Sequence, residues 1–226
     1  FIEYYNPQMV SQRDKPYENI NGSYGMRLFH WGRDPHGLKN IEVFTDQMKN
    51  IYERLKINKN SRFAISSYII PLIDSNRIAM NNPHSISSSF FIKDNKLHLN
   101  QHIRANDFIQ NLHKDVFRWS FIQETLAGWL KVDLGQMTLM YDSLYMRQKD
   151  YENIEKYEIN IFDIYDNYPP EQDMRLSRIM WDKTIKDLIW IEAEWRQGIA
   201  MDNSVKTGNK YWDNCFRAIL FRVGLP

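Results

Sequence analysis

The sequence predicts an α+β fold, in which an antiparallel sheet packs against separate helices. Two strand-like segments are joined by Asp94 and Asn95, a two-residue turn typical of a β-hairpin. Helical segments occur at irregular intervals along the chain, instead of alternating with strands as in a parallel α/β fold. One of them, at residues 115–132, is apolar around most of its circumference, which indicates burial on several sides. We expect one domain over residues 1–226.

Composition narrows the classes of function. The net charge of +1 gives no reason to expect binding to nucleic acid or to a membrane surface. No apolar run approaches the roughly 18 residues of a membrane span, and no signal peptide is visible. Cys215 is the only cysteine, which excludes an intrachain disulfide and fits a reducing compartment, so we expect a cytoplasmic protein. The chain starts at Phe1 without a methionine, which leaves open whether residues precede it.

The first expected helix spans residues 45–56, with Thr45 at its N-cap and Asp46 near its positive end. Its apolar residues fall on one face, at Met48, Ile51, Tyr52 and Leu55. The next segment, 62–70, is rich in β-branched and aromatic residues, which predicts a strand. The residues before the turn at Asn21 and Gly22 are expected to be irregular.

The hairpin strands are expected at residues 85–92 and 96–103. The second strand alternates apolar and polar residues, so one of its faces is expected to be buried. After the buried helix, we expect a strand at 136–143, mixed and partly helical structure at 144–157, a boundary at Pro169 and Pro170, and helices at 173–196 and 211–222.

Two groups of polar residues are candidate metal sites. His98 and His102 share a strand face, but they lie about 13 Å apart at roughly 3.3 Å per residue, too far to share one ion. His30, Asp34 and His36 are close in sequence, but a proline and a glycine within the same stretch favour a polar surface loop. We therefore expect no metal site.

Three segments carry a recognisable pattern: NGSYGMRL at 21–28, NPHSISSSFFIKDNKLHLNQHIRANDFIQNLHKDVF at 82–117 and SLYMRQKDYE at 143–152. Together they resemble the core of the thymidylate synthase family, which includes the pyrimidine-nucleotide hydroxymethylases. The resemblance covers about residues 20–157, and 170–226 are a divergent helical part. It implies a large twisted mixed sheet flanked by helices, with homodimerisation through the sheet face.

The family's catalytic cysteine follows a proline in the turn before the hairpin, and here His84 follows Pro83. The resemblance implies a reaction in which a thiolate adds to carbon 6 of a pyrimidine, so that carbon 5 attacks a folate-borne one-carbon unit. A histidine is a weak nucleophile for that addition, but its neutral ring could act as a general base that adds water to carbon 6. Ser85 is adjacent, and Tyr24 matches the Tyr-Gly segment beside the family's active site. The candidate catalytic residues are therefore His84, Ser85 and Tyr24.

The phosphate-binding residues implied by the resemblance are two arginines. Arg104 matches the family's arginine-serine motif, with Ala105 in place of the serine. Arg62 matches the first of two arginines that cross the dimer interface, with Phe63 in place of the second. Arginine binds phosphate through forked hydrogen bonds. The alternative for each arginine is a surface ion pair.

Asp115 matches the position that reads the base, which is asparagine in uracil-specific members of the family. A carboxylate only accepts hydrogen bonds, so it suits the amino group of cytosine, and cytidylate is favoured over uridylate. The alternative is a helix N-cap, and the two roles are compatible. Asp107 matches the residue that meets the folate pterin. Tyr145 and Arg147 fall at the family's sugar-contacting positions.

The resemblance predicts a transferase that adds a methyl or hydroxymethyl group to carbon 5 of a pyrimidine nucleotide, with 5,10-methylenetetrahydrofolate as cofactor. The replacement at His84 leaves open whether the chain is an active enzyme. One alternative is a catalytically lapsed module of the same fold that binds a nucleotide or forms a dimer. Another is a non-folate reaction that uses His84 as a base.

Overall fold

The computed structural model describes residues 24–29, 45–74, 83–154, 173–196 and 207–222. The chain falls into two units, each of which is described by itself. The first contains the residues up to Trp119 and Gly135–Met146, and the second contains Ser120–Leu134 and the residues from Arg147 onward. Helix α6 (Leu112–Leu130) is continuous and contributes to both. The expectation of one thymidylate synthase-like domain over the whole chain stays a prediction.

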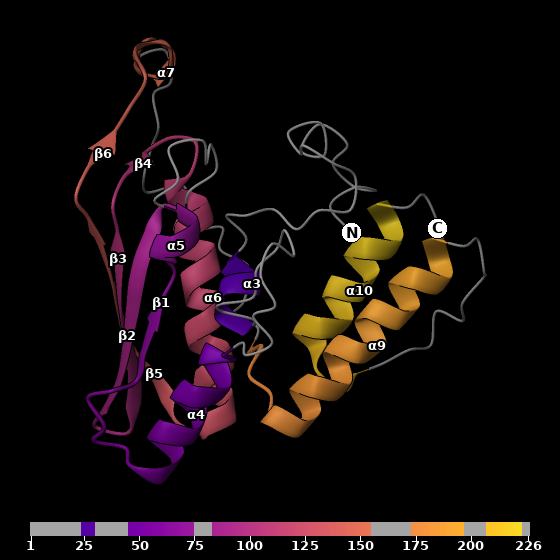
Figure 1. Cartoon of the computed structure of the whole chain (residues 1–226). Coiled ribbons are helices and arrows are strands. Elements are labelled where there is room, and N and C mark those ends of the chain that lie inside the picture. The colour runs from indigo at the N-terminus through magenta and orange to yellow at the C-terminus, as the bar shows by residue number, and fades with distance from the viewer. Residues whose placement is uncertain (1–23, 30–44, 75–82, 155–172, 197–206, 223–226) are drawn as a thin grey trace. The chain divides into compact units, whose positions relative to one another are not determined.

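Four strands form the main sheet (Figure 1), namely β1 (Ile65–Ser67), β2 (Ser85–Lys93), β3 (Lys96–Ile103) and β5 (Asp133–Tyr141). Their order in the sheet is β1-β2-β3-β5, and β2 is antiparallel to both β1 and β3. The turn residues Asp94 and Asn95 have φ angles of 51° and 57°, as a two-residue type I′ turn requires. The predicted hairpin is confirmed.

Strand β5 runs in the same direction as β3. The backbone N–H of Gln136 donates to Nδ1 of His98 at 3.1 Å, and that of Asp142 donates to the carbonyl of Ile103 at 3.0 Å. The partners therefore advance together along both strands, as in a parallel pair. The predicted mixed sheet flanked by helices is thus confirmed, whereas its twist and its role in a homodimer stay predictions.

Short elements surround the main sheet in the first unit. Strands β4 (Asn106–Asp107) and β6 (Leu144–Tyr145) form a separate parallel pair, which follows β3 and β5 along the chain. Among the described residues, the helices that precede β2 are α3 (Tyr24–Phe29), α4 (Gln47–Ile57) and α5 (Pro71–Asp74). Helix α4 contacts α3, β1 and β2, so it covers one face of the sheet (Figure 1).

The core of the first unit combines these helices with the sheet. On α4, Met48, Ile51 and Leu55 are buried as expected, whereas Tyr52 is only partly covered. Alternation along β3 buries one apolar face, as the sequence predicts. The largest buried side chains of this core are Leu28, Met48, Ile51, Leu55, Tyr68, Phe90, Leu97, Leu99, Ile103 and Trp119.

Two polar side chains join the first elements of this unit. Arg27 on α3 is buried and forms an ion pair with Asp74 on α5 at 2.7 Å. Gln47 donates from Nε2 to the carbonyls of Arg27 and Ser67, both at 2.8 Å. Because buried polar groups are costly when unpaired, these contacts fix α3, α4 and α5 against β1.

The second unit is helical and contains α7 (Gln148–Ile154), α9 (Arg178–Arg196), α10 (Lys210–Arg222) and the second half of α6. Aromatic rings form its core, and they are Phe121, Trp129, Trp181, Tyr211 and Trp212. The indole N–H of Trp212 donates to the carbonyl of Met174 at 2.9 Å. Within the described ranges, none of the helices has the length and apolar composition needed to cross a membrane.

Several element boundaries differ from the expected ones. Asp46, not Thr45, caps α4, because its carboxylate accepts from the backbone N–H of Lys49 at 2.8 Å. The backbone N–H of Asp115 donates to the carbonyl of Asn111 at 2.9 Å, so Asp115 lies inside the first turn of α6. The alternative that Asp115 is an N-cap is therefore wrong.

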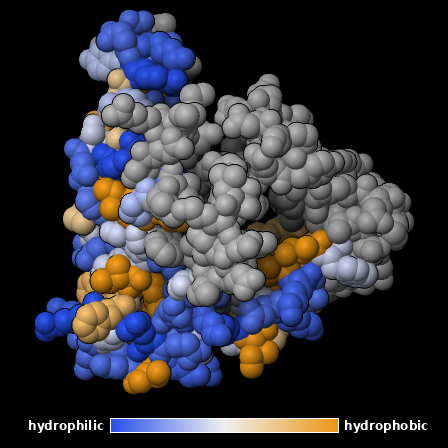
Figure 2. Space-filling model, viewed as in Figure 1, coloured by the Kyte–Doolittle hydropathy of each residue, from blue (hydrophilic) through white to orange (hydrophobic). Residues whose placement is uncertain are grey.

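Large apolar side chains are exposed at the start of strand β1. Phe63 has 72% of its surface exposed and Ile65 has 53%. Figure 2 shows that apolar areas alternate with hydrophilic ones on the described part of the visible face. Exposed aromatic and aliphatic groups at a sheet edge are typical of surfaces that another chain covers.

Gly128 on α6 allows a close approach of the chain at Leu176. A Cβ atom at position 128 would lie 2.8 Å from the carbonyl oxygen and 3.0 Å from the backbone nitrogen of Leu176. We expect Gly128→Ala to lower the free energy of unfolding by about 1–3 kcal/mol, because backbone atoms cannot rotate away. The measurement is urea denaturation. An unchanged free energy of unfolding in Gly128→Ala would contradict this account of the close approach.

Candidate functional site

The candidate site lies where the chain enters β2, and Tyr24 holds that entry in place. The Tyr24 hydroxyl accepts hydrogen bonds from the backbone N–H groups of His84 at 3.1 Å and Ser85 at 3.0 Å. Both N–H groups lie at the very start of β2, where they donate to the Tyr24 hydroxyl and not to a neighbouring strand, so a side chain from α3 provides the acceptor. The position of His84 therefore depends on a residue 60 positions earlier in the chain.

The hydrogen bonds of His84 determine its tautomer. Nδ1 lies 2.8 Å from the carbonyl oxygen of Ala105, and the side chain is exposed. A carbonyl oxygen only accepts, so Nδ1 carries the hydrogen in the neutral ring and Nε2 keeps its lone pair. The structure thus leaves the outer ring nitrogen of His84 available as a base.

Arg104 lies beside His84. Its backbone N–H donates to the carbonyl of His84 at 2.9 Å, and its Nε donates to the carbonyl of Pro83 at 3.1 Å. Among the described residues, the guanidinium of Arg104 forms its hydrogen bond through Nε, and the side chain is exposed. The structure brings together these two predicted site residues, the imidazole and the arginine.

Ser85 is buried immediately after His84, and its hydroxyl has no hydrogen-bond partner among the described residues. A serine nucleophile requires a base within hydrogen-bond reach. The described part of the chain places no such base at the hydroxyl of Ser85.

Asp115 is a buried carboxylate held by three donors. It accepts from Nη1 of Arg118 at 2.7 Å, from the hydroxyl of Tyr141 at 3.3 Å and from Nδ2 of Asn106. Burial raises the pKa of the Tyr141 hydroxyl, and the adjacent charge of Asp115 raises it further. Tyr141 therefore stays protonated and continues to donate.

Arg118 connects this carboxylate to Tyr24. Its guanidinium carbon lies 4.6 Å from the centre of the Tyr24 ring, as in a cation–π contact. The edge of the same ring meets Trp119, with ring centres 5.4 Å apart. Tyr24 thus links His84 on one side with the Asp115–Arg118 pair on the other.

Arg62 lies elsewhere in the same chain. It precedes β1 and is exposed, and the nearby Ala64 pairs with Phe90, close to the hairpin end of β2. Six residues of strand separate Phe90 from His84, which is about 20 Å at the usual rise per residue. Within one chain, therefore, Arg62 and Arg104 do not meet at one phosphate. The action of Arg62 across a dimer interface stays a prediction.

The remaining predicted residues have local roles. Asp107 is buried, and its Oδ1 accepts from the backbone N–H groups of Ile109 at 3.0 Å and Gln110 at 2.9 Å. Tyr145 is exposed on β6, opposite Asp107 in the strand pair. Arg147 belongs to the second unit and forms an ion pair with Asp150 at 2.8 Å.

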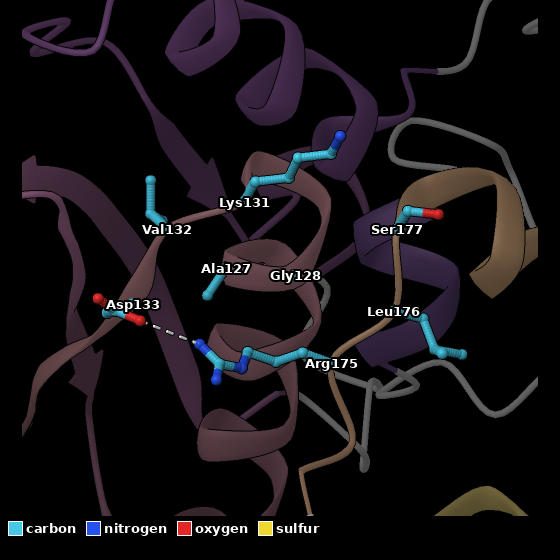
Figure 3. Close-up of a pocket in the computed structure, with 8 residues that line it drawn as sticks. All are labelled: Ala127, Gly128, Lys131, Val132, Asp133, Arg175, Leu176 and Ser177. Atoms are coloured by element: carbon cyan, nitrogen blue, oxygen red, sulfur yellow. Dashed lines mark hydrogen bonds and ion pairs between the residues drawn. The ribbon is translucent and has the colours of Figure 1, made fainter. Parts of the chain in front are cut away.

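A cavity of about 340 Å³ lies in the second unit (Figure 3), lined by Ala127, Gly128, Lys131, Val132, Asp133, Arg175, Leu176 and Ser177. Arg175 reaches towards Asp133, at 3.4 Å, and also pairs with Asp173 at 2.9 Å. The hydrogen bond from Arg175 lowers the pKa of the Asp173 carboxyl. No predicted site residue lines this cavity. The described residues contain no group of three or more histidine, cysteine or acidic side chains placed to hold a metal ion, and His30, Asp34 and His36 lie outside them.

The sequence did not predict three residues of the site, namely Asn106, Arg118 and Tyr141. Arg118 had a signal, since it lies three positions after Asp115 on a predicted helix, where opposite charges meet. Asn106 and Tyr141 had none, because their contacts depend on how β3, β5 and α6 pack.

Comparisons with known proteins bear on this site. No family model matches the chain. It is 32% identical over 156 residues to a deoxyuridylate hydroxymethyltransferase of Bacillus phage SP01, a match that covers 63% of the chain and 39% of that protein. It is 28% identical over 154 residues to a putative thymidylate synthase of Methanosarcina acetivorans, covering 68% and 64%. A putative thymidylate synthase of Methanococcoides burtonii is 26% identical over 155 residues, covering 69% and 65%.

The chain is similar to thymidylate synthase-like proteins. It spans about two fifths of the phage hydroxymethyltransferase and just under two thirds of the two archaeal proteins. These relatives support the resemblance seen in the sequence segments. The consequence of histidine at position 84 and the preference for cytosine stay predictions.

The double hydrogen bond at Tyr24 can be tested by Tyr24→Phe. The variant leaves the N–H groups of His84 and Ser85 without their acceptor, and Ser85 is buried. We expect the free energy of unfolding to fall by about 1–3 kcal/mol, with faster hydrogen exchange at both amides. Tyr211→Phe is the matched control, since the hydroxyl of Tyr211 bonds to the Cys215 thiol, which is a weak hydrogen-bonding partner. Unchanged exchange at residues 84 and 85 would contradict the role given to Tyr24.

Proposed function

We propose that this protein is a thymidylate synthase-like transferase that binds a pyrimidine nucleotide and transfers a one-carbon unit to carbon 5. The observation that carries the proposal is the grouping of His84 and Arg104 beside Tyr24 and the Asp115–Arg118 pair. The relatives, named as a hydroxymethyltransferase and as thymidylate synthases, support the same reaction class. The proposal includes the preference for cytidylate over uridylate suggested by a carboxylate at position 115.

The proposed phosphate site begins with Arg104, whose exposed guanidinium lies beside the turn that carries His84. In the proposed homodimer, Arg62 of a second copy would supply the other cation. The exposed Phe63 and Ile65 support this arrangement, because they would be covered when the copies associate. Tyr145 and Arg147 are proposed to contact the sugar.

The residues that the structure describes do not fit 5,10-methylenetetrahydrofolate. Asp107, which the resemblance assigns to the pterin, is buried and accepts hydrogen bonds from the turn that leads into α6. The proposal of folate as one-carbon donor therefore rests on the resemblance to the family.

A second candidate function is a non-folate reaction, which the fixed tautomer of His84 favours. Nε2 of His84 would take a proton from water while the hydroxyl adds to carbon 6 of the ring. Carbon 5 then takes up a proton, which completes the hydration of the double bond. Reversal of this step exchanges the hydrogen on carbon 5 with solvent, so the two candidate functions share one measurable signal.

The test is tritium release from carbon 5 of labelled dCMP and dUMP, with and without methylenetetrahydrofolate. The transferase proposal expects folate-dependent release, faster from dCMP, whereas folate-independent release supports hydration. Absence of release from both nucleotides by folded protein contradicts both reactions. Thermal stabilisation by a nucleotide without release then identifies a lapsed binding module.

His84→Ala tests the role of the imidazole. Loss of a general base reduces the rate by about a hundredfold or more, so tritium release should fall by that factor. Nucleotide binding, measured by thermal shift, should persist through Arg104. His113→Ala is the matched control, since His113 is an exposed histidine on α6. Equal rates in the two variants would remove His84 from the reaction.

A further inference from the structure

The hydrogen-bonding capacity of Asp115 is almost fully used inside the protein. A carboxylate offers about four lone-pair positions. One oxygen of Asp115 accepts from Arg118, and the other accepts from Asn106 and Tyr141. The residue is only 3% exposed. Asp115 can therefore offer a ligand about one further acceptor position, on the oxygen that faces Arg118.

Arg118 has the opposite balance. A guanidinium carries five N–H donors, and Arg118 uses Nη1 alone in hydrogen bonds to the described residues. Its side chain is 35% exposed, while that of Asp115 is 5% exposed. Of the two members of the pair, Arg118 is thus the one that can present several donors to a ligand.

The orientation of Arg118 is set in advance. The carboxylate of Asp115 holds one edge of the guanidinium, and the face of the Tyr24 ring supports it. An arginine held in this way has little conformational freedom left to lose when a ligand binds. Its donors therefore bind a ligand at a low entropic cost. The hydroxyl of the same Tyr24 accepts from the backbone of His84, so one side chain contacts both the guanidinium and the proposed reactive residue.

We infer that Arg118 is a specificity-determining residue, which donates a hydrogen bond to an acceptor atom on the ring edge of the pyrimidine. This inference rests on the proposed function. Asp115 then acts mainly as a positioning residue, and its remaining lone pair takes an adjacent ring or amino N–H. Cytosine carries an acceptor at N3 beside a donor at N4, and uracil carries a donor at N3 beside an acceptor at O4. Each base therefore offers Arg118 an acceptor, and the reversed order is compatible with the proposed preference for cytosine. A ligand without a pyrimidine ring gains nothing from Arg118.

The test compares binding of dCMP, dUMP and deoxyribose 5-phosphate to wild type and to Arg118→Met by isothermal titration calorimetry. Methionine keeps an unbranched apolar stem but has no donor. We expect both nucleotides to bind at least about tenfold more weakly, the usual effect of losing a hydrogen bond to a charged group. Deoxyribose 5-phosphate, which lacks the pyrimidine base, should bind to the variant as it does to wild type.

The matched control is Arg178→Met in the second unit, which also removes an arginine lying over an aromatic ring, here 5.5 Å from the centre of Trp129. It should leave nucleotide affinity unchanged. If Arg118→Met does not fold, Arg118→Lys takes its place, since lysine keeps the charge but loses the planar fork. Affinity for both nucleotides should again fall, while affinity for deoxyribose 5-phosphate should stay as in wild type.

Two results would overturn the inference while leaving the proposed function intact. One is nucleotide affinity equal to wild type in Arg118→Met. The other is an equal loss of affinity for nucleotides and for deoxyribose 5-phosphate, which would show that Arg118 only supports the local structure. Failure of wild type to bind any pyrimidine nucleotide is a different result, and it would overturn the proposed function as well.

Discussion

The hydroxyl of Tyr24 is the contact on which the candidate site depends. One oxygen accepts two backbone hydrogen bonds, from His84 and Ser85, at the point where β2 begins. The ring of the same residue packs edge-on against Tyr68 and Trp119 in the core. Because unpaired backbone donors are costly when buried, the turn before β2 is held in a single position relative to α3 and the start of α6.

Charge in the site is arranged around this contact. The buried carboxylate of Asp115 would be unfavourable alone, but Arg118, Asn106 and Tyr141 supply donors to it. Arg118 is in turn supported by the Tyr24 ring. A site built in this way has its polar groups oriented before a ligand arrives, so little free energy is lost in ordering them. Arginine is therefore placed at the centre of the proposed base recognition.

Local sequence signals predicted the parts of the fold that depend on neighbouring residues. Asp94 and Asn95 tolerate positive φ angles, so the hairpin could be predicted from two residues. The spacing of Met48, Ile51 and Leu55 likewise revealed the buried face of α4. Helix ends are less predictable, because several polar residues near a helix start can serve as caps. The sequence allows an N-cap at Asp115, but α6 begins three residues earlier.

The sequence by itself determined the α+β class, the hairpin and the set of residues that resemble a pyrimidine-nucleotide site. Tertiary structure alone decided which of them meet: His84 with Arg104, but not with Arg62 of the same chain. It also paired Asp115 with Tyr141, 26 positions later. The physical reason is that hydrogen bonds and burial act at distances of a few ångströms in space, and separation along the chain does not predict those distances once strands and helices pack.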